Sequence, residues 1–131
     1  MSFRRLAVWI DHHEARIFHV LAESFDKTTI DAPHRHVHRH PKGQEVDKNR
    51  DKEHPDDAHH FFHDVSRALD DAAEVLIVGP STAKLHLIKY IHQHEHALEP
   101  KIVGLETVDH PTDGQLVAYA KQYFKASDRM H

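Results

Sequence analysis

The segment that decides the fold is Val75-Leu76-Ile77-Val78-Gly79-Pro80, in the second half of the 131-residue chain. Four consecutive apolar residues have the length of a strand, and the Gly-Pro pair after them is a turn signal. A strand that is apolar at every position has both faces buried, as in the middle of a sheet with parallel neighbours. The segment therefore predicts a partly parallel sheet covered by helices.

The residues before this segment predict a β-hairpin and a third strand. Residues 6–10 are an apolar run of strand length, residues 11–14 are polar turn formers, and residues 15–22 supply the second strand. Residues 24–30 alternate poorly, but Thr28, Thr29 and Ile30 provide the β-branched side chains that favour a strand. Three sequential strands are expected.

The residues on either side of this central strand also predict helices. Pro55 suits the first position of a helix, and Ser81 can cap a second one. Residues 102–105 predict another buried strand. The apolar residues of the three expected helices are Ala58, Phe61, Phe62, Val65, Leu69 and Ala72; Leu85, Ile88 and Ile91; and Leu116, Val117, Ala120 and Phe124.

The expected order is β-β-β-(long loop)-α-β-α-β-α in one domain spanning residues 1–131. Alternating strands and helices in the second half favour right-handed crossovers. The fold class is therefore α/β, a mixed β-sheet of about five strands with three helices. A chain of this length buries one core, which excludes a multidomain enzyme.

A long hydrophilic loop is expected at residues 32–54, where only Val37 and Val46 are aliphatic apart from Ala32. Such a loop in a small domain is usually functional or disordered. Within it, residues 34–44 contain three permanent cations, four histidines and no acid. Arginine and lysine neutralise phosphates, and imidazoles stack on bases or bond to phosphate and sugar oxygens. The candidate RNA-binding residues are His34, Arg35, His36, His38, Arg39, His40 and Lys42.

The alternative interpretation of this cationic segment is a solvated loop without a partner, because the acidic residues among positions 45–53 dilute its charge. The net charge does not decide between them. It is -4 with 17 neutral histidines. At pH 7 about a quarter of exposed histidines are protonated, which brings the chain close to neutrality.

Composition excludes several classes of protein. No cysteine is present, which removes disulfides, thiolate metal sites, iron-sulfur clusters and cysteine nucleophiles. No apolar run approaches the ~20 residues of a membrane span, and residues 1–5 do not form a signal peptide. A cytoplasmic protein without a membrane partner is expected.

The histidines also permit a metal-responsive or pH-responsive binding protein. The alternating histidines of residues 34–40 would share one face of an extended backbone, and His59 with His63 and His92 with His96 have the i, i+4 spacing of helical ligand pairs. Seventeen histidines produce such pairs by chance, and no His-Glu-x-x-His motif is present. No physiological metal site and no cofactor is therefore predicted.

Two Gly-Gln dipeptides occur, and only one has a structural explanation. Residues 112–115 have the form of a capping box, in which Thr112 and Gln115 bond to each other's backbone. No apolar helix begins at Gln44, so Gly43 and Gln44 are expected at the exposed tip of the cationic loop. They are the better functional candidates.

Two other chemistries are weaker alternatives. Asp11, Glu14, Asp31 and Asp113 would serve a nuclease only if they converged on a divalent cation, and the first two are explained as turn residues. Residues 79–84 follow a strand and open a helix, but lack the second glycine and the Lys-Ser/Thr ending of a phosphate-binding loop.

Several of these segments resemble the middle domain of archaeal and eukaryotic class-1 peptide chain release factors and their Pelota relatives. Residues 6–11 and 15–18 resemble the opening hairpin, and residues 75–80 with Lys84 resemble the central strand, turn and helix. The basic insertion stands where release factors carry a Gly-Gly-Gln loop. The chain is similar to a bacterial single-domain branch often described as translational machinery proteins, and the resemblance covers nearly all of it.

The resemblance implies a ribonuclease-H-like fold and a loop that enters the ribosomal peptidyl-transferase centre, where a glutamine positions water against the peptidyl-tRNA ester. Only Gly43 and Gln44 match this motif as catalytic candidates. Lys42 replaces the first glycine and resists the backbone angles that a glycine pair adopts. Binding to ribosomes without catalysis is therefore favoured over hydrolysis.

The function that the resemblance implies is that of a ribosome- or tRNA-associated translation factor, in release, rescue or hibernation. The expected partner is ribosomal RNA or transfer RNA, and DNA is not expected. An adaptor that keeps the translation-factor fold but binds a protein is a further alternative. The sequence leaves the oligomeric state open.

Overall fold

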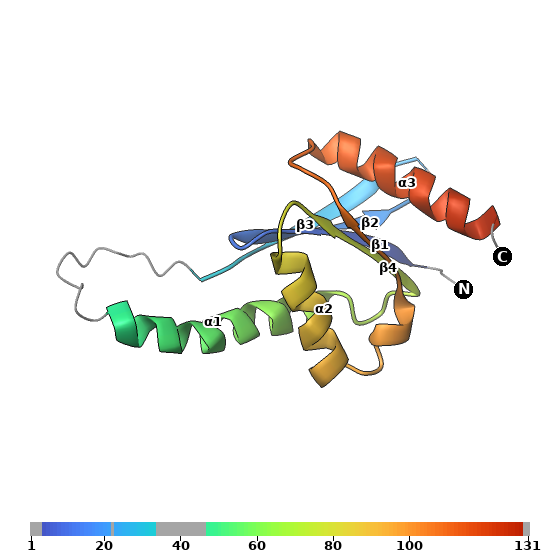
Figure 1. Ribbon diagram of the computed structural model, residues 1–131. Helices are drawn as coiled ribbons and strands as arrows, with labels where there is room; N and C mark the ends of the chain where they lie inside the picture. The colour runs from blue at the N-terminus through green and yellow to red at the C-terminus, as the bar shows by residue number, and fades with distance from the viewer. Residues whose placement is uncertain (1–3, 22, 34–46, 130–131) are drawn as a thin grey trace.

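The computed structural model describes residues 4–21, 23–33 and 47–129, in which helices cover both faces of one sheet (Figure 1). The α/β class, the five strands and the three α-helices confirm the prediction. The elements are β1 (Arg5–Ile10), β2 (Glu14–Val20), β3 (Phe25–Asp31), α1 (Asp47–Ala68), β4 (Glu74–Gly79), α2 (Ala83–His94), the short 3-10 helix η3 (Glu99–Lys101), β5 (Ile102–Thr107) and α3 (Asp113–Arg129).

The sheet is mixed and has the strand order β3-β2-β1-β4-β5. The hairpin strands β1 and β2 pair antiparallel, as do β2 and β3, whereas β4 lies parallel to both β1 and β5. The apolar run of β4 has no exposed surface at any of its four positions. The predicted strand with two buried faces is therefore confirmed between two parallel neighbours.

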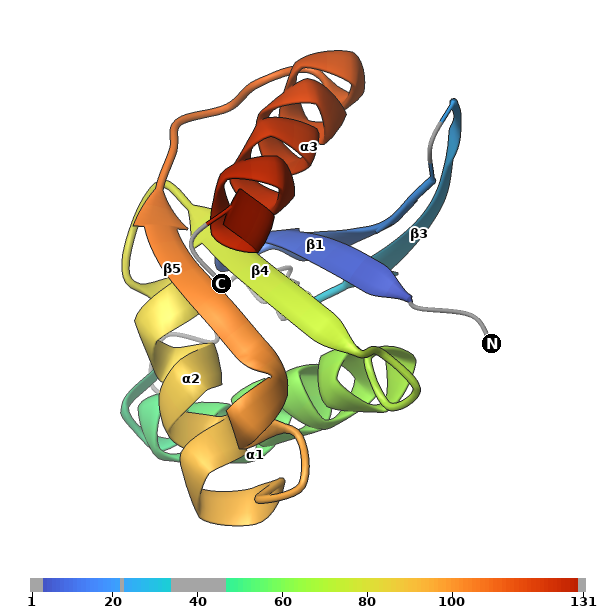
Figure 2. The same ribbon diagram turned by 90° about the vertical axis from the view of Figure 1, so that its right-hand side faces the viewer.

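Two hydrophobic cores lie on opposite faces of the sheet. Helices α1 and α2 cover one face, and α3 covers the other (Figure 2). Alternate residues of β1 point into the two cores, so that Val8 faces α1 and α2 whereas Trp9 faces α3. The predicted apolar stripe of α3 is buried against the second core.

Three predictions about the second half of the chain were wrong. Strand β5 is an edge strand with partly exposed residues, because it has a neighbour on one side only, and Leu105 is 37% exposed. In α2, Leu85 is exposed and Leu87 is buried instead. The helix begins at Ala83 after Thr82, so the predicted Ser81 cap is absent. Which residues of the helix face the core depends on how it packs against the sheet.

The prediction of a loop over residues 32–54 was wrong for residues 47–54, which are helical. Helix α1 begins at Asp47 and continues through Pro55, which therefore does not start it. A proline inside a helix removes one backbone hydrogen bond, at a cost of about 3 kcal/mol. Residues 47–54 contain Lys, Arg and Glu, which favour helix, and no glycine, so the helix extends before the proline.

Asp113 attaches the start of α3 to β2 and β3. Its two carboxylate oxygens accept hydrogen bonds from Arg16 Nη1 at 2.9 Å and from Lys27 Nζ at 2.7 Å. Arg16 also lies over the ring of Trp9, 4.3 Å from its centroid. The hydrogen bond from Lys27, followed by that from Arg16, lowers the pKa of the Asp113 carboxyl against the opposing effect of desolvation.

The predicted capping box at the start of α3 is confirmed. The backbone N–H of Gln115 donates to Thr112 Oγ1 at 3.1 Å, and the backbone N–H of Thr112 donates to the side-chain oxygen Oε1 of Gln115 at 3.0 Å. These bonds satisfy two of the backbone donors that a helix start leaves unpaired. Gln115 therefore has the structural role expected of it.

The close approach of β4 to β1 requires glycine at position 79, which gives a test. A Cβ atom on Gly79 would collide with the backbone carbonyl of Ile10. We expect Gly79→Ala to lower the free energy of unfolding by about 1–3 kcal/mol. The control Gly114→Ala adds a Cβ with no atom within 4 Å, and is expected to raise stability by about 0.4–1 kcal/mol. Urea unfolding curves that give both variants the same stability would contradict this packing.

The ion pairs of Asp113 predict a pH-dependent stability. The folded state lowers the pKa of this carboxyl, so its contribution is present above the pKa of the unfolded chain and is lost as the pH falls through the folded value. Asp113→Asn is expected to lower the free energy of unfolding at pH 7 by about 1 kcal/mol or less, since the pairs are partly exposed. The difference from the parent should shrink in acid. The control is Asp70→Asn, which replaces an exposed aspartate after α1. If both variants lower the free energy of unfolding equally, the ion pairs of Asp113 do not stabilise the fold.

Candidate nucleic-acid interface

The carboxyl ends of β1, β3, β4 and β5 lie at one edge of the sheet, which we call the carboxyl edge. These strands share one direction, because β1 is parallel to β4 and β5, and β3 is antiparallel to β2. The start of α1 lies on the same side of the molecule as the end of β3 (Figure 1). Residues 34–46 are therefore joined to the fold at the carboxyl edge, where α/β sheets commonly bind ligands.

All the sequence-predicted site residues lie outside the described residues. The candidate RNA-binding residues are His34, Arg35, His36, His38, Arg39, His40 and Lys42, and the candidate catalytic residues are Gly43 and Gln44. Their roles stay predictions. What the structure describes is the surface from which this segment departs.

The turn between β1 and β2 presents two exposed histidines at this edge. Asp11 Oδ1 accepts the backbone N–H groups of His13 at 2.8 Å and Glu14 at 2.9 Å, which fixes the predicted turn. The backbone carbonyl of His13 in turn accepts the N–H of Ala32 at 2.8 Å. The chain that leads into residues 34–46 is thus bound to the histidine turn.

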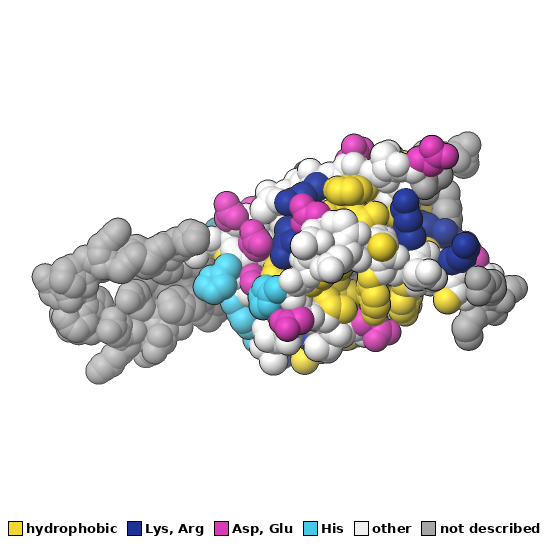
Figure 3. All heavy atoms as spheres, turned by 90° about the horizontal axis from the view of Figure 1, so that it is seen from above, with side chains coloured by type: hydrophobic (Ala, Val, Ile, Leu, Met, Phe, Trp, Pro, Cys, Tyr) yellow, Lys and Arg dark blue, Asp and Glu magenta, His cyan; other side chains and the backbone are white. Residues whose placement is uncertain are grey.

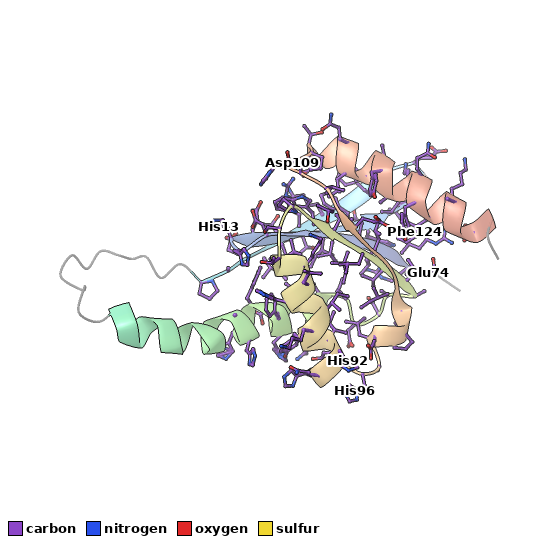
Figure 4. All side chains as sticks on the ribbon, in the orientation of Figure 1. His13, Glu74, His92, His96, Asp109 and Phe124 are labelled. Atoms are coloured by element: carbon purple, nitrogen blue, oxygen red, sulfur yellow. The ribbon has the colours of Figure 1, made fainter. Side chains whose placement is uncertain are left out.

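A third histidine reaches the same place from α2. The ring of His12 lies edge-on to that of His86, with 5.9 Å between centroids, and its Nε2 is 3.3 Å from Thr82 Oγ1. Histidine side chains gather at this end of the molecule (Figure 3), and His13 lies at the opposite end of the sheet from Glu74 (Figure 4). Imidazoles can donate to phosphate and sugar oxygens, so the edge has suitable chemistry for RNA.

Sequence reasoning missed this group. It treated residues 11–14 as turn formers only, although the two adjacent histidines directly after a buried strand were a usable signal. The proximity of His86 had no sequence signal, because it depends on how α2 packs against β1.

On the α3 side, the carboxyl edge carries the exposed carboxylate of Asp109. The Trp9 indole N–H donates to the backbone oxygen of Asp109 at 2.8 Å, and the His110 ring lies 5.2 Å from the indole. A cavity of about 510 Å³ beside them is lined by residues 108–111, 115, 116 and 119. The Asp109 side chain is 92% exposed, and its Oδ1 lies 2.9 Å from His110 Nδ1. This side is therefore less suited to phosphate than the histidine side.

Three of the four carboxylates of the nuclease alternative have other partners. Glu14 lies 3.4 Å from Arg16 Nε, Asp113 pairs with Arg16 and Lys27, and Asp11 holds the hairpin turn. Across residues 4–21, 23–33 and 47–129, no three His, Asp or Glu side chains form a group that could hold a metal ion.

In each of the two helical histidine pairs, His59 with His63 and His92 with His96, the first member contacts other side chains. His59 packs against the rings of Tyr90 and His94, at centroid distances of 5.6 and 5.7 Å. His92 Nδ1 lies 2.7 Å from a carboxylate oxygen of Glu99, and His96 follows the end of α2 (Figure 4).

Lys84, which carries part of the family resemblance, is structural here. Its side chain is buried, and Nζ donates to the backbone carbonyl of Ser81 at 2.6 Å. This bond holds the turn between β4 and α2. The ammonium group is consequently not directed at a phosphate ligand, which argues against a phosphate-binding loop.

No helix of the described chain has both the length and the apolar character needed to cross a bilayer.

No protein-family model matches this sequence, and the search of curated proteins found no match to it. Solved structures do resemble it. Pelota of Archaeoglobus fulgidus aligns with a TM-score of 0.62 and 11% identity over 91% of this chain and 31% of that protein. Pelota of Thermoplasma acidophilum aligns with a TM-score of 0.57 and 18% identity over 86% and 30%.

The archaeal translation termination factor aRF1 aligns with a TM-score of 0.53 and 15% identity, over 97% of this chain and 39% of that protein. The chain thus spans 30–39% of the length of these three proteins. At these identities the likeness is one of fold. The fold that the resemblance implied is confirmed: this chain has the architecture of one part of Pelota and of aRF1.

Proposed function

We propose that this protein is a translation factor that binds ribosomes, with ribosomal or transfer RNA as its direct partner and residues 34–44 as its main contact. The observation that carries the proposal is the place where this segment joins the fold. It departs from the carboxyl edge of a sheet whose architecture is that of part of an archaeal translation termination factor. Release, rescue and hibernation of ribosomes are the roles that such binding would serve.

The charge of the segment supports RNA as the partner. Its three cations and four histidines are not accompanied by any acid. Arginine and lysine neutralise phosphates, which makes such binding strong at low salt and weak at high salt. The neighbouring histidines at positions 12, 13 and 86 extend a surface able to bond to phosphate.

Gln44 is proposed as a water-positioning group in peptidyl-tRNA ester hydrolysis. The amide of Gln44, together with the backbone of Gly43, would orient water against the ester carbonyl. Lys42 limits this activity, because it restricts the backbone angles that two consecutive glycines would allow. Binding is therefore the primary function proposed and hydrolysis a secondary one.

Neutralising the cationic segment is expected to weaken ribosome binding. In co-sedimentation with purified ribosomes over a salt series, the parent should dissociate as salt rises. The triple variant Arg35→Gln, Arg39→Gln, Lys42→Gln should bind more weakly and with a salt dependence lower by roughly 2 in log-log slope, since each lost phosphate contact removes about 0.7–0.9.

The matched control removes three cations at the other edge of the sheet: Arg67 in the last turn of α1, Lys101 in η3 and Lys125 in α3. This variant has the same net charge as the first and is expected to bind like the parent. Binding by the first triple variant at the parent's strength and salt dependence would exclude residues 34–44 as the contact.

The two Gly-Gln dipeptides provide a test of catalysis. Gln44→Ala is expected to abolish peptidyl-tRNA hydrolysis on ribosomes without changing co-sedimentation, because the amide acts on water and not on binding. Lys42→Gly, which restores the glycine pair, should increase the hydrolysis rate. The control Gln115→Ala removes the capping-box glutamine and should affect stability only. Hydrolysis that survives Gln44→Ala would rule out the catalytic role.

A further inference from the structure

A groove between α1 and α2 shares only His86 with the surface of the function proposed above. It has a volume of about 310 Å³, near the lower end of the ~300–1,000 Å³ typical of ligand pockets. It lies on the opposite face of the sheet from α3. Its described lining residues are Ala58, His59, Phe62, His86, Lys89, Tyr90 and Gln93, and none of them is acidic.

The wall of the groove is aromatic. The Tyr90 ring lies 4.7 Å from that of His94 with a 40° angle between planes, and 5.6 Å from that of His59. Phe62 is buried behind them, 6.0 Å from Tyr90. His59 and His94 are exposed and Tyr90 is partly exposed, so this aromatic group offers accessible ring surface for stacking.

The rim of the groove is polar and basic. His86, Lys89 and Gln93 are exposed and follow each other on α2 at spacings of three and four residues, which places them on one face of the helix. Burial, together with the nearby carboxylate of Glu95, raises the pKa of Tyr90. The phenol hydroxyl, which is protonated at neutral pH even without this shift, can donate a hydrogen bond. The face thus combines a cation and hydrogen-bonding groups with the aromatic wall.

We propose that the α1–α2 groove binds single-stranded RNA, with a base stacked on the Tyr90, His59 and His94 rings and the adjoining phosphate bound by Lys89. Proteins bind single strands through this combination of aromatic platforms and positive charge. The contact of His86 with His12 joins the groove to the carboxyl edge. One strand can therefore pass from the edge into the groove, but the groove is a separate site whose binding does not require ribosomes.

The test uses the full chain and a fluorescein-labelled oligouridylate of about 10 nucleotides, within the site sizes of ~4–16 nucleotides known for single-strand binding. Binding is measured by fluorescence anisotropy at low salt. Tyr90→Leu removes the stacking ring and should weaken binding roughly tenfold, in the range that loss of one stacked base produces. Tyr90→Phe keeps the ring and should retain binding. Lys89→Gln, at an exposed position, should weaken binding without affecting the fold.

The controls place the same changes on the other face of the sheet. Tyr119 and Lys125 lie on α3, and Tyr119→Leu and Lys125→Gln should bind like the parent. Circular dichroism tests whether each variant is folded. If Tyr90→Leu does not fold, the binding of Lys89→Gln decides the outcome. Parent-like binding by Lys89→Gln and by folded Tyr90→Leu, or no binding by the parent, overturns the proposal.

The same assay separates this inference from the proposed ribosome contact. The triple variant at positions 35, 39 and 42 is measured beside the groove variants. Loss of oligouridylate binding by that variant alone overturns the groove proposal and leaves the ribosome proposal standing. Loss by the groove variants, with normal ribosome co-sedimentation, supports the groove as an independent RNA site.

Discussion

The burial of two adjacent parallel strands, β1 and β4, at every position after their first residues is the constraint on which the rest of the structure depends. Strands β1 and β4 contribute side chains to both hydrophobic cores, so each face of the sheet must be covered. Helices α1 and α2 cover one face and α3 the other (Figure 2). Because parallel strands need crossovers, α1 and α2 are also the connections that make β4 and β5 parallel to β1, whereas α3 follows β5.

This topology concentrates polar chemistry at one edge. Parallel strands end on the same side, so the hairpin turn, the start of α2 and the start of α3 meet there. Local hydrogen bonds then fix each piece: Asp11 holds the hairpin turn, and Asp113 attaches α3 to β2 and β3. The segment at residues 34–46 departs from a surface whose side chains are held in place by these bonds.

The distribution of histidine matters more than the net charge. Exposed imidazoles lie at the hairpin turn, along α2 and on α1, where they meet an exposed lysine and a tyrosine. On the opposite side of the carboxyl edge, the exposed carboxylate of Asp109 lies beside the His110 ring. A chain with a formal net charge of -4 therefore still has one face suited to a polyanion.

The sequence by itself determined the α/β class, the strand in the middle of the sheet, the hairpin turn at Asp11, the capping box at Gln115 and the cationic character of residues 34–44. Each follows from local periodicity or from bonds between residues close in the chain. Only the tertiary structure decided that β5 is an edge strand and that Leu87 and not Leu85 faces the core. The start of α1 before Pro55 is different, because it follows from the helix-forming residues at positions 47–54, which the prediction of a long loop overlooked. It also brought His12 to His86 and built the groove around Tyr90. Contacts between residues so far apart depend on how the helices pack on the sheet, which local pattern does not specify.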